Sequence, residues 1–152
     1  MTLHQAHERL MRYCDKAERC QQDALRLALK WGFSMDEAHG LVAQLITEGF
    51  ISEQRYASAF AHDKFAFYQW GARKIEQGLK RKGITERNIR DALKNIPKDD
   101  EADTIVGLIK KKEPQLRGLQ LYQKKVKLMR YLLSKGFASD DIGPHVERFL
   151  NG

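Results

Sequence analysis

The sequence has few of the residues that interrupt helices or cross-link small folds. It contains only 3 prolines and 2 cysteines among 152 residues. So few prolines leave long helical runs possible almost everywhere. The two cysteines, Cys14 and Cys20, cannot form the framework of a disulfide-rich fold. A chain of this length can bury a core large enough to fold without such cross-links.

Long apolar segments are also missing from the sequence. No window approaches the roughly 18 consecutive apolar residues of a membrane-spanning helix. The first residues lack the apolar core of a secretory signal peptide. We therefore expect a protein that does not enter a membrane and that works in the cytoplasm.

The motifs of common catalytic and cofactor sites are absent as well. The sequence has no phosphate-binding GxxxxGK[ST] or GxGxxG loop and no HExxH motif. His4 and His7 can share a helix face and could form a zinc site with Cys14 and Cys20, but these cysteines are farther apart than the usual cysteine pair of such a site. The remaining histidines are scattered. No combination of Ser, His and Asp, or of Cys and His, stands out. We expect no catalytic residue, no metal, no cofactor and no enzymatic activity.

A short motif occurs three times, at intervals of about 50 residues, in segments 30–34, 81–85 and 134–139. Each copy has a basic or polar residue, then glycine, then a large apolar residue, and then a hydroxyl residue close behind. Glycine just after a helix adopts the left-handed conformation without a steric penalty, and Ser or Thr caps the next helix. Ser34 forms a capping box with Glu37, and Thr85 and Ser139 are predicted caps too.

The apolar residues repeat with helical spacing, and no segment alternates long enough to predict a strand. We predict an all-α fold of nine helices, arranged as three tandem three-helix repeat units in an elongated, curved array. The predicted helices are 2–16, 19–31, 34–48, 52–68, 71–82, 85–96, 99–112, 117–135 and 139–150. Pro144 lies inside the last range, so that helix alternatively begins near Gly143.

The predicted units comprise residues 1–50, 51–96 and 97–152, and they differ in charge. The whole chain has 27 Lys and Arg against 20 Asp and Glu, a net charge of +7. Basic residues outnumber acidic ones in the second and third units, whereas the first unit is nearly balanced. This excess predicts a polyanion, such as single- or double-stranded DNA, or an acidic protein surface as partner.

Two predicted helices carry the most concentrated basic faces. The helix at 71–82 places Arg73, Lys74, Lys80 and Arg81 opposite its apolar residues. The helix at 117–135 repeats this bias with Lys124, Lys125, Lys127 and Arg130. Corresponding helices of a repeat array can contact one partner together, although basic faces are often simply solvated.

The end of the predicted helix 52–68 combines a lysine with aromatic residues. Lys64 falls inside the apolar stripe, where it either extends its ammonium group to the edge or contacts the junction between units. We expect Phe67 and Trp70 in the core. Whether Phe65 and Tyr68 pack there or stack on nucleic acid bases is left open.

Segments 50–60, 70–75 and 79–84 together resemble the signature of the RecX family. In that family an aromatic and acidic stretch precedes Arg-aromatic-Ala, which is 55–57 here. A Gly-x-x-[Arg/Lys]-Ile helix, here 71–75, then leads to Leu-x-x-Lys-Gly-[Ile/Val], here 79–84. The resemblance covers nearly the whole chain. It departs from the pattern at Ser52-Glu53, where an acidic pair is usual, and at Trp31.

This resemblance implies a bacterial cytoplasmic regulator of the RecA recombinase with no enzymatic activity of its own. It implies binding in the groove of the RecA filament on DNA, with inhibition of ATP hydrolysis, strand exchange and filament growth, and thus an effect on recombination and DNA repair. Basic positions of the family pattern fall on Arg55, Lys64, Arg73, Lys74, Arg81 and Lys82. The alternative is a stand-alone DNA-binding protein without a RecA-specific contact. We expect a monomer.

Overall fold

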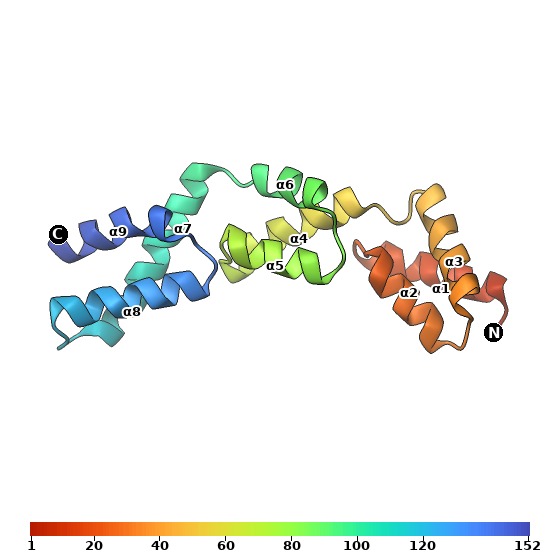
Figure 1. Cartoon of the computed structure of the whole chain (residues 1–152), viewed down its shortest axis with the longest axis horizontal. Coiled ribbons are helices and arrows are strands. Elements are labelled where there is room, and N and C mark those ends of the chain that lie inside the picture. The colour runs from red at the N-terminus through yellow and green to blue at the C-terminus, as the bar shows by residue number, and fades with distance from the viewer. The chain divides into compact units, whose positions relative to one another are not determined.

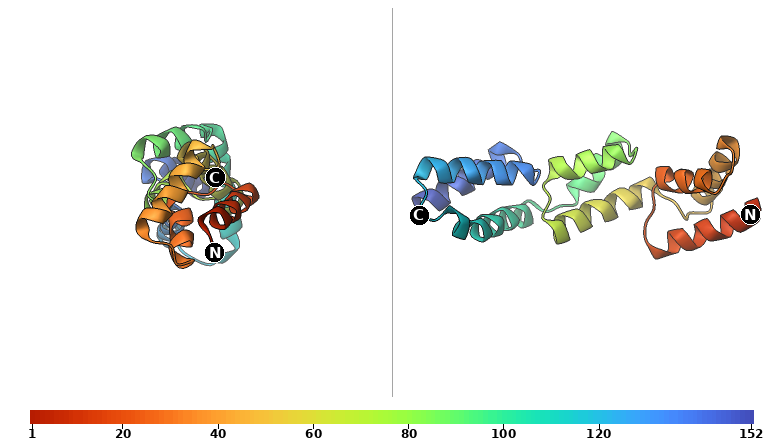
Figure 2. Two further views of the ribbon diagram at one scale, coloured as in Figure 1. Left: turned by 90° about the vertical axis from the view of Figure 1, so that its right-hand side faces the viewer. Right: turned by 90° about the horizontal axis from the view of Figure 1, so that it is seen from below.

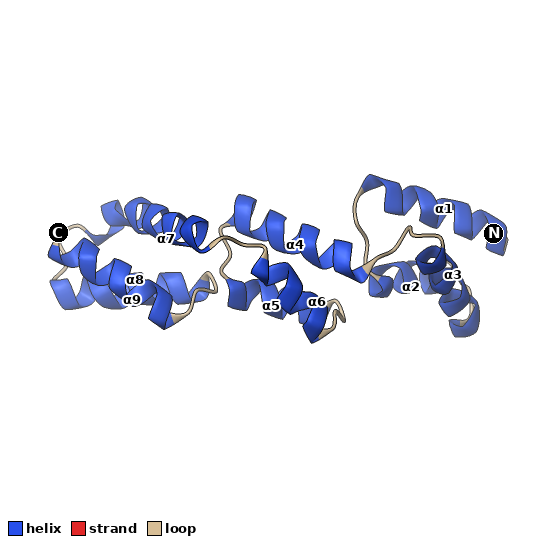
Figure 3. Cartoon of the chain, turned by 90° about the horizontal axis from the view of Figure 1, so that it is seen from above, coloured by secondary structure: helices blue, strands red, loops and turns tan.

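The structure, a computed structural model that describes residues 1–152, is built from helices alone (Figure 3). This confirms the predicted all-α fold and its nine α-helices. A short 3-10 helix, η1 (Glu113–Leu116), follows the seventh of them. The α-helices are α1 (Leu3–Lys16), α2 (Gln21–Lys30), α3 (Met35–Thr47), α4 (Glu53–Tyr68), α5 (Ala72–Arg81), α6 (Glu86–Lys94), α7 (Lys98–Lys112), α8 (Leu121–Ser134) and α9 (Ser139–Asn151).

The repeated glycine motif ends a helix at each of its three positions. Gly32, Gly83 and Gly136 have φ angles of 97°, 77° and 99°. After each glycine, the amide of the apolar residue donates back to a carbonyl in the last turn of the helix, as Phe33 does to Ala28 at 3.3 Å. This is the Schellman arrangement, which satisfies the last carbonyls of a helix. Gly49, with φ 82°, ends α3 in the same way.

The helix starts agree with the predicted caps except at the last helix. Ser34 and Glu37 form the expected capping box, and the Thr85 hydroxyl accepts from the Asn88 amide. Ser139, however, is the first helical residue of α9, and Ala138 stands at the cap position without a side-chain bond. The alternative start near Gly143 is also wrong, because α9 continues through Pro144. Pro144 is exposed, so water can satisfy the carbonyl that its missing N–H leaves unpaired.

The chain folds into two compact units, and the boundary between them passes through α4, α5 and the end of α6. The first unit contains residues 1–60 and 79–92. In it α3 packs against both α1 and α2 (Figure 1). Its core consists of small and medium apolar side chains, with Leu10, Leu45 and Ile51 among the most buried. The division into three units of three helices stays a prediction.

The second compact unit contains residues 61–78 and 93–152. Helix α9 packs against both α7 and α8 in it (Figures 1 and 2). Its core includes Leu128, Leu132 and Phe137, all almost completely buried. No helix in the chain combines the length and the apolar character needed to cross a bilayer.

Two chain corners are joined by their backbones inside the second unit. The Gly71 amide donates to the Lys135 carbonyl at 2.7 Å, and the Arg73 amide donates to the Gly136 carbonyl at 3.0 Å. The first amides of α5 and the carbonyls after α8 lack partners within their own helices. Each corner therefore supplies the hydrogen-bond partners that the other lacks. This joint fixes the position of the basic residues at the start of α5.

Candidate functional site

Two of the basic residues singled out from the sequence form ion pairs inside the first compact unit. The Arg55 Nε lies 3.0 Å from Oε1 of Glu18, and the same guanidinium donates to the Gly49 carbonyl at 2.7 Å. The Lys82 ammonium lies 3.0 Å from the Asp23 carboxylate, and both side chains are partly buried. These pairs join segments 37 and 59 residues apart in sequence. They therefore help to hold the unit together.

Lys64 and Lys74 lie beside aromatic rings in the second unit. Their ammonium groups are 4.9 and 4.7 Å from the centroid of the Trp70 ring, and Lys64 is also 4.5 Å from that of Tyr68. These are cation–π distances. Trp70 is half-buried, whereas Phe67 is 69% exposed. The expectation that Phe67 packs in the core is therefore wrong: α4 turns this ring to the surface.

A third lysine completes this group. The Lys135 ammonium donates to the Tyr68 carbonyl at 2.7 Å. Burial lowers the pKa of Lys135, and the positive charges of Lys74 and Lys111 lower it further. We call Lys64, Tyr68, Trp70, Lys74 and Lys135 the aromatic–lysine cluster. The lowered pKa thus reflects mainly the partial burial of this lysine and, to a smaller extent, the positive charge around it.

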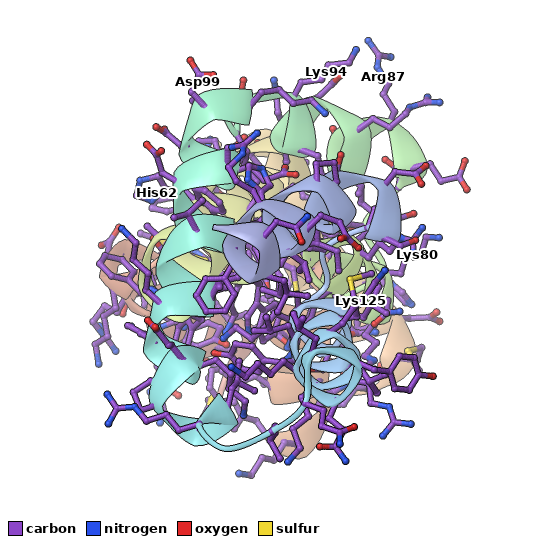
Figure 4. All side chains as sticks on the ribbon, turned by 90° about the vertical axis from the view of Figure 1, so that its left-hand side faces the viewer. His62, Lys80, Arg87, Lys94, Asp99 and Lys125 are labelled. Atoms are coloured by element: carbon purple, nitrogen blue, oxygen red, sulfur yellow. The ribbon has the colours of Figure 1, made fainter.

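The other basic residues of α5 are exposed. Arg73 belongs to the second compact unit, whereas Lys80 and Arg81 belong to the first. Figure 4 shows the Lys80 side chain extending away from the ribbon. Exposed cations of this kind attract anionic partners in a way that depends on salt concentration.

The basic residues of α8 separate into two groups. The Lys125 ammonium lies 2.6 Å from the Glu147 carboxylate of α9, and both side chains are about half exposed; Figure 4 labels Lys125 on α8. Lys124 is half-buried. Lys127 and Arg130 are exposed and lie on a different part of the helix, where they line an open groove.

This groove, which we call the basic groove, lies between the end of α7 with η1 and the helix α8. Its volume is about 420 Å³. The Lys112 ammonium lies 4.8 Å from the centroid of the Tyr131 ring. No acidic side chain lines the groove, so its cations reinforce one another. The lining residues are Lys112, Gln115, Lys127, Arg130, Tyr131 and Ser134.

Two of these six residues, Lys127 and Arg130, were predicted from the sequence, and the other four were not. Lys112 ends a run of three lysines on α7, and Gln115 lies in η1. Tyr131 and Ser134 follow Lys127 at intervals of four and seven residues, which places them on the same face of α8. The spacing was therefore visible in the sequence. The approach of η1 to that face was not, because it depends on the turn between α7 and α8.

The basic groove combines three cations with a hydroxyl, an amide and an aromatic ring. Lysine and arginine groups of this kind neutralise phosphates or carboxylates, and a tyrosine ring can stack on a base. No three His, Cys, Asp or Glu side chains lie close enough together to hold a metal ion. The arrangement is suited to electrostatic binding of an anionic strand or surface.

Two segments of the chain match models of known protein families. Residues 52–93 match the family model described as "RecX, second three-helix domain". Residues 99–143 match the model described as "RecX, third three-helix domain". Together the two matches cover more than half of the chain, and they include nearly all of α4 to α8 and the start of α9.

Individual relatives agree with these matches. The chain is 29% identical over 143 residues to "Regulatory protein RecX" of Clostridium perfringens, covering 93% of this chain and 66% of the relative. It is 31% identical over 138 residues to the protein of that name from Clostridium botulinum, covering 90% and 63%. The chain thus spans slightly less than two thirds of the length of these relatives.

A solved structure supports the fold. The crystal structure of RecX from Lactobacillus salivarius matches with a TM-score of 0.86 at 20% identity, covering 98% of this chain and 96% of that one. At this identity the match shows the fold alone. The matched domain models extend from α4 to the first turn of α9, and relatives of the same name extend the similarity over nine tenths of the sequence. The chain therefore belongs to the RecX family of regulatory proteins.

Proposed function

We propose that this protein binds the filament of the RecA recombinase on DNA and inhibits its ATPase, strand exchange and growth. It thereby modulates recombination and DNA repair. Membership in a family of regulatory proteins supports the regulatory role. We also propose that it acts as a monomer in the bacterial cytoplasm, without a cofactor and without catalysis of its own.

The basic groove is the structural feature that supports the proposed binding surface. Lys112, Lys127 and Arg130 line it together with no acidic side chain, so the groove presents positive charge to a negatively charged partner. Arg55 and Lys82 already pair with acidic residues of the chain. We therefore place the partner contact on α7 and α8, with Arg73 at the start of α5 as an additional exposed cation.

The alternative is a DNA-binding protein that affects RecA only by occupying DNA. The Tyr131 ring beside Lys112 in the groove favours this reading, because aromatic–cation pairs suit single strands. Three phosphate contacts would make binding to a single strand depend on salt with a logarithmic slope of about −2. Binding to RecA protein surfaces need not follow that slope.

Co-sedimentation with RecA filaments tests the proposed function. Filaments assembled on single-stranded DNA are pelleted with increasing amounts of the protein, and DNA alone is titrated in parallel. We expect tighter binding to filaments than to DNA, and a loss of at least about tenfold in the double variant Lys127→Glu/Arg130→Glu. The matched control is Arg87→Glu/Arg90→Glu, which makes the same change of charge on exposed residues of α6.

The outcomes separate the two candidates. Equal affinity for DNA and for filaments, with the slope expected for phosphate contacts, would establish the DNA-binding alternative. Equal loss in the groove variant and in the α6 control would show that net charge matters and the basic groove does not.

A further inference from the structure

A second hollow in the same compact unit has a different character from the basic groove. It lies between α7 and α9, which pack against each other (Figure 1). Its volume is about 140 Å³, and no acidic side chain lines it. The lining residues are Val106, Ile109, Lys110, His145, Arg148 and Phe149.

The walls of this α7–α9 pocket are apolar and sized for one side chain. Val106, Ile109 and Phe149 form them, and Ile109 belongs to the buried core of the unit. A cavity of about 150 Å³ with aliphatic and aromatic walls is large enough to bind benzene. The pocket therefore has room for a leucine or phenylalanine side chain, and its burial there would be favoured by the hydrophobic effect.

The remaining side chains give the pocket a positive rim. Lys110 lies in the last turn of α7 and Arg148 in the last turn of α9, and both are exposed. Neither is among the ion pairs of the chain. An apolar occupant with adjacent carboxylates would match both the walls and this rim.

His145 also lines the pocket. Its Nδ1 atom is buried and has no hydrogen-bond partner. Buried polar atoms in native proteins are nearly always paired, and each exception needs an explanation. Because this atom is buried, a bound group would remove the cost only by turning the ring so that Nδ1 gains a partner.

We propose that the α7–α9 pocket binds a short peptide segment of a partner protein, in which a Leu or Phe side chain is flanked by Asp or Glu. The apolar side chain enters between Val106, Ile109 and Phe149. The flanking carboxylates pair with Lys110 and Arg148. This proposal does not depend on the function proposed above, because the pocket and the basic groove share no residue.

Fluorescence anisotropy with labelled six-residue peptides tests the proposal on the full chain. The first peptide has the sequence Asp-Glu-Leu-Phe-Asp-Glu. The second replaces Leu-Phe by Ser-Ser, the third replaces the four acidic residues by Lys, and a labelled oligothymidylate represents nucleic acid. We expect the first peptide to bind at least about tenfold more tightly than the second or third, since both burial and charge contribute.

Variants locate the binding. Lys110→Ser/Arg148→Ser should weaken binding of the first peptide at least about tenfold. Lys111→Ser/Arg117→Ser removes the same charge from exposed residues of the same unit outside the pocket, and it should leave the affinity unchanged. Phe149→Ala should also weaken binding, with circular dichroism used to verify that the helices remain folded.

Three results would overturn the proposal. Equal binding of the Ser-Ser peptide would mean that charge alone is read and the apolar pocket is not used. Equal weakening by both charge variants would place the contact outside the pocket. Binding of the oligothymidylate with no binding of the first peptide would assign this end of the unit to nucleic acid.

Discussion

Gly71 and Gly136 pack so closely that neither has room for a side chain. A Cβ atom on Gly71 would lie 2.5 Å from the carbonyl carbon of Gly136, and one on Gly136 would lie 2.5 Å from the Cβ of Lys74. This contact brings the start of α5 to the end of α8, where the backbone hydrogen bonds of the joint form. The positions of Arg73 and Lys74 therefore depend on two residues that have no side chain.

Gly71→Ala should destabilise the second compact unit. The new methyl group would meet backbone atoms, which cannot move aside as a flexible side chain would, so we expect a loss of about 2–3 kcal/mol. In a chain of this length that corresponds to a fall in Tm of roughly 5–10 °C. Thermal unfolding followed by circular dichroism measures it.

Gly107→Ala is the matched control on α7. A Cβ there would meet nothing within 4 Å, and alanine is the better helix former by about 0.5–1 kcal/mol. Tm should therefore stay equal or rise. A Gly71→Ala protein as stable as the native one would contradict the close contact.

The glycines of the repeated motif should be needed for their backbone conformation. Gly32→Ala places a Cβ in open space but at φ +97°, so we expect a loss of about 1 kcal/mol from conformation alone. Gly40→Ala, inside α3 and also in open space, should stabilise by a similar amount. Urea unfolding of the two variants compares them directly, and a shift of both in the same direction would refute this explanation.

Lys82 should contribute to stability through Asp23. We expect Lys82→Met to cost about 1 kcal/mol, and a double-mutant cycle with Asp23→Asn to give a coupling energy of similar size. Arg81→Met, which changes the exposed neighbour, should have almost no effect. A coupling energy near zero would mean that the pair is only a surface contact.

Cys20 should be chemically inert in the native protein. Burial raises the pKa of its thiol to about 11, and the side chain is completely buried. At pH 8 the thiolate fraction of Cys20 is then about 100-fold lower than for a thiol of pKa 9. Any reaction of the Cys20 thiol should become faster as the pH rises toward about 11. Titration with a thiol-reactive dye should modify Cys20 only after urea is added, and rapid labelling of Cys20 in buffer would contradict this. The pKa of Cys14 is also raised by burial, so its labelling should be slow.

Local signals in the sequence predicted most of the fold. Ser34 with Glu37, and glycine followed by an apolar residue, act through neighbouring backbone groups, so their effect is readable without tertiary structure. Capping boxes formed by Thr2 with Gln5 and by Gln120 with Gln123 follow the same rule with glutamine, and they were not among the predicted caps.

Contacts between distant segments were not predictable in the same way. The sequence does not show that Arg55 meets Glu18, or that Gly71 meets Gly136, because such pairs depend on how whole helices pack. Phe67 illustrates the same limit. Its spacing is compatible with the apolar stripe of α4, but no neighbouring element covers it. The charge counts identified the basic helices. Only the structure shows which of their lysines and arginines form ion pairs and which are exposed.

Inhibition of RecA ATP hydrolysis tests the central claim most directly. The assay titrates native protein, Lys127→Glu/Arg130→Glu and Arg87→Glu/Arg90→Glu against RecA on single-stranded DNA, with DNA in excess of any amount that the protein could coat. We predict inhibition below one molecule per RecA subunit by the native protein and the α6 control, and a loss of at least about tenfold in potency for the groove variant. No inhibition by the native protein under this excess of DNA, or equal inhibition by all three proteins, would contradict the account.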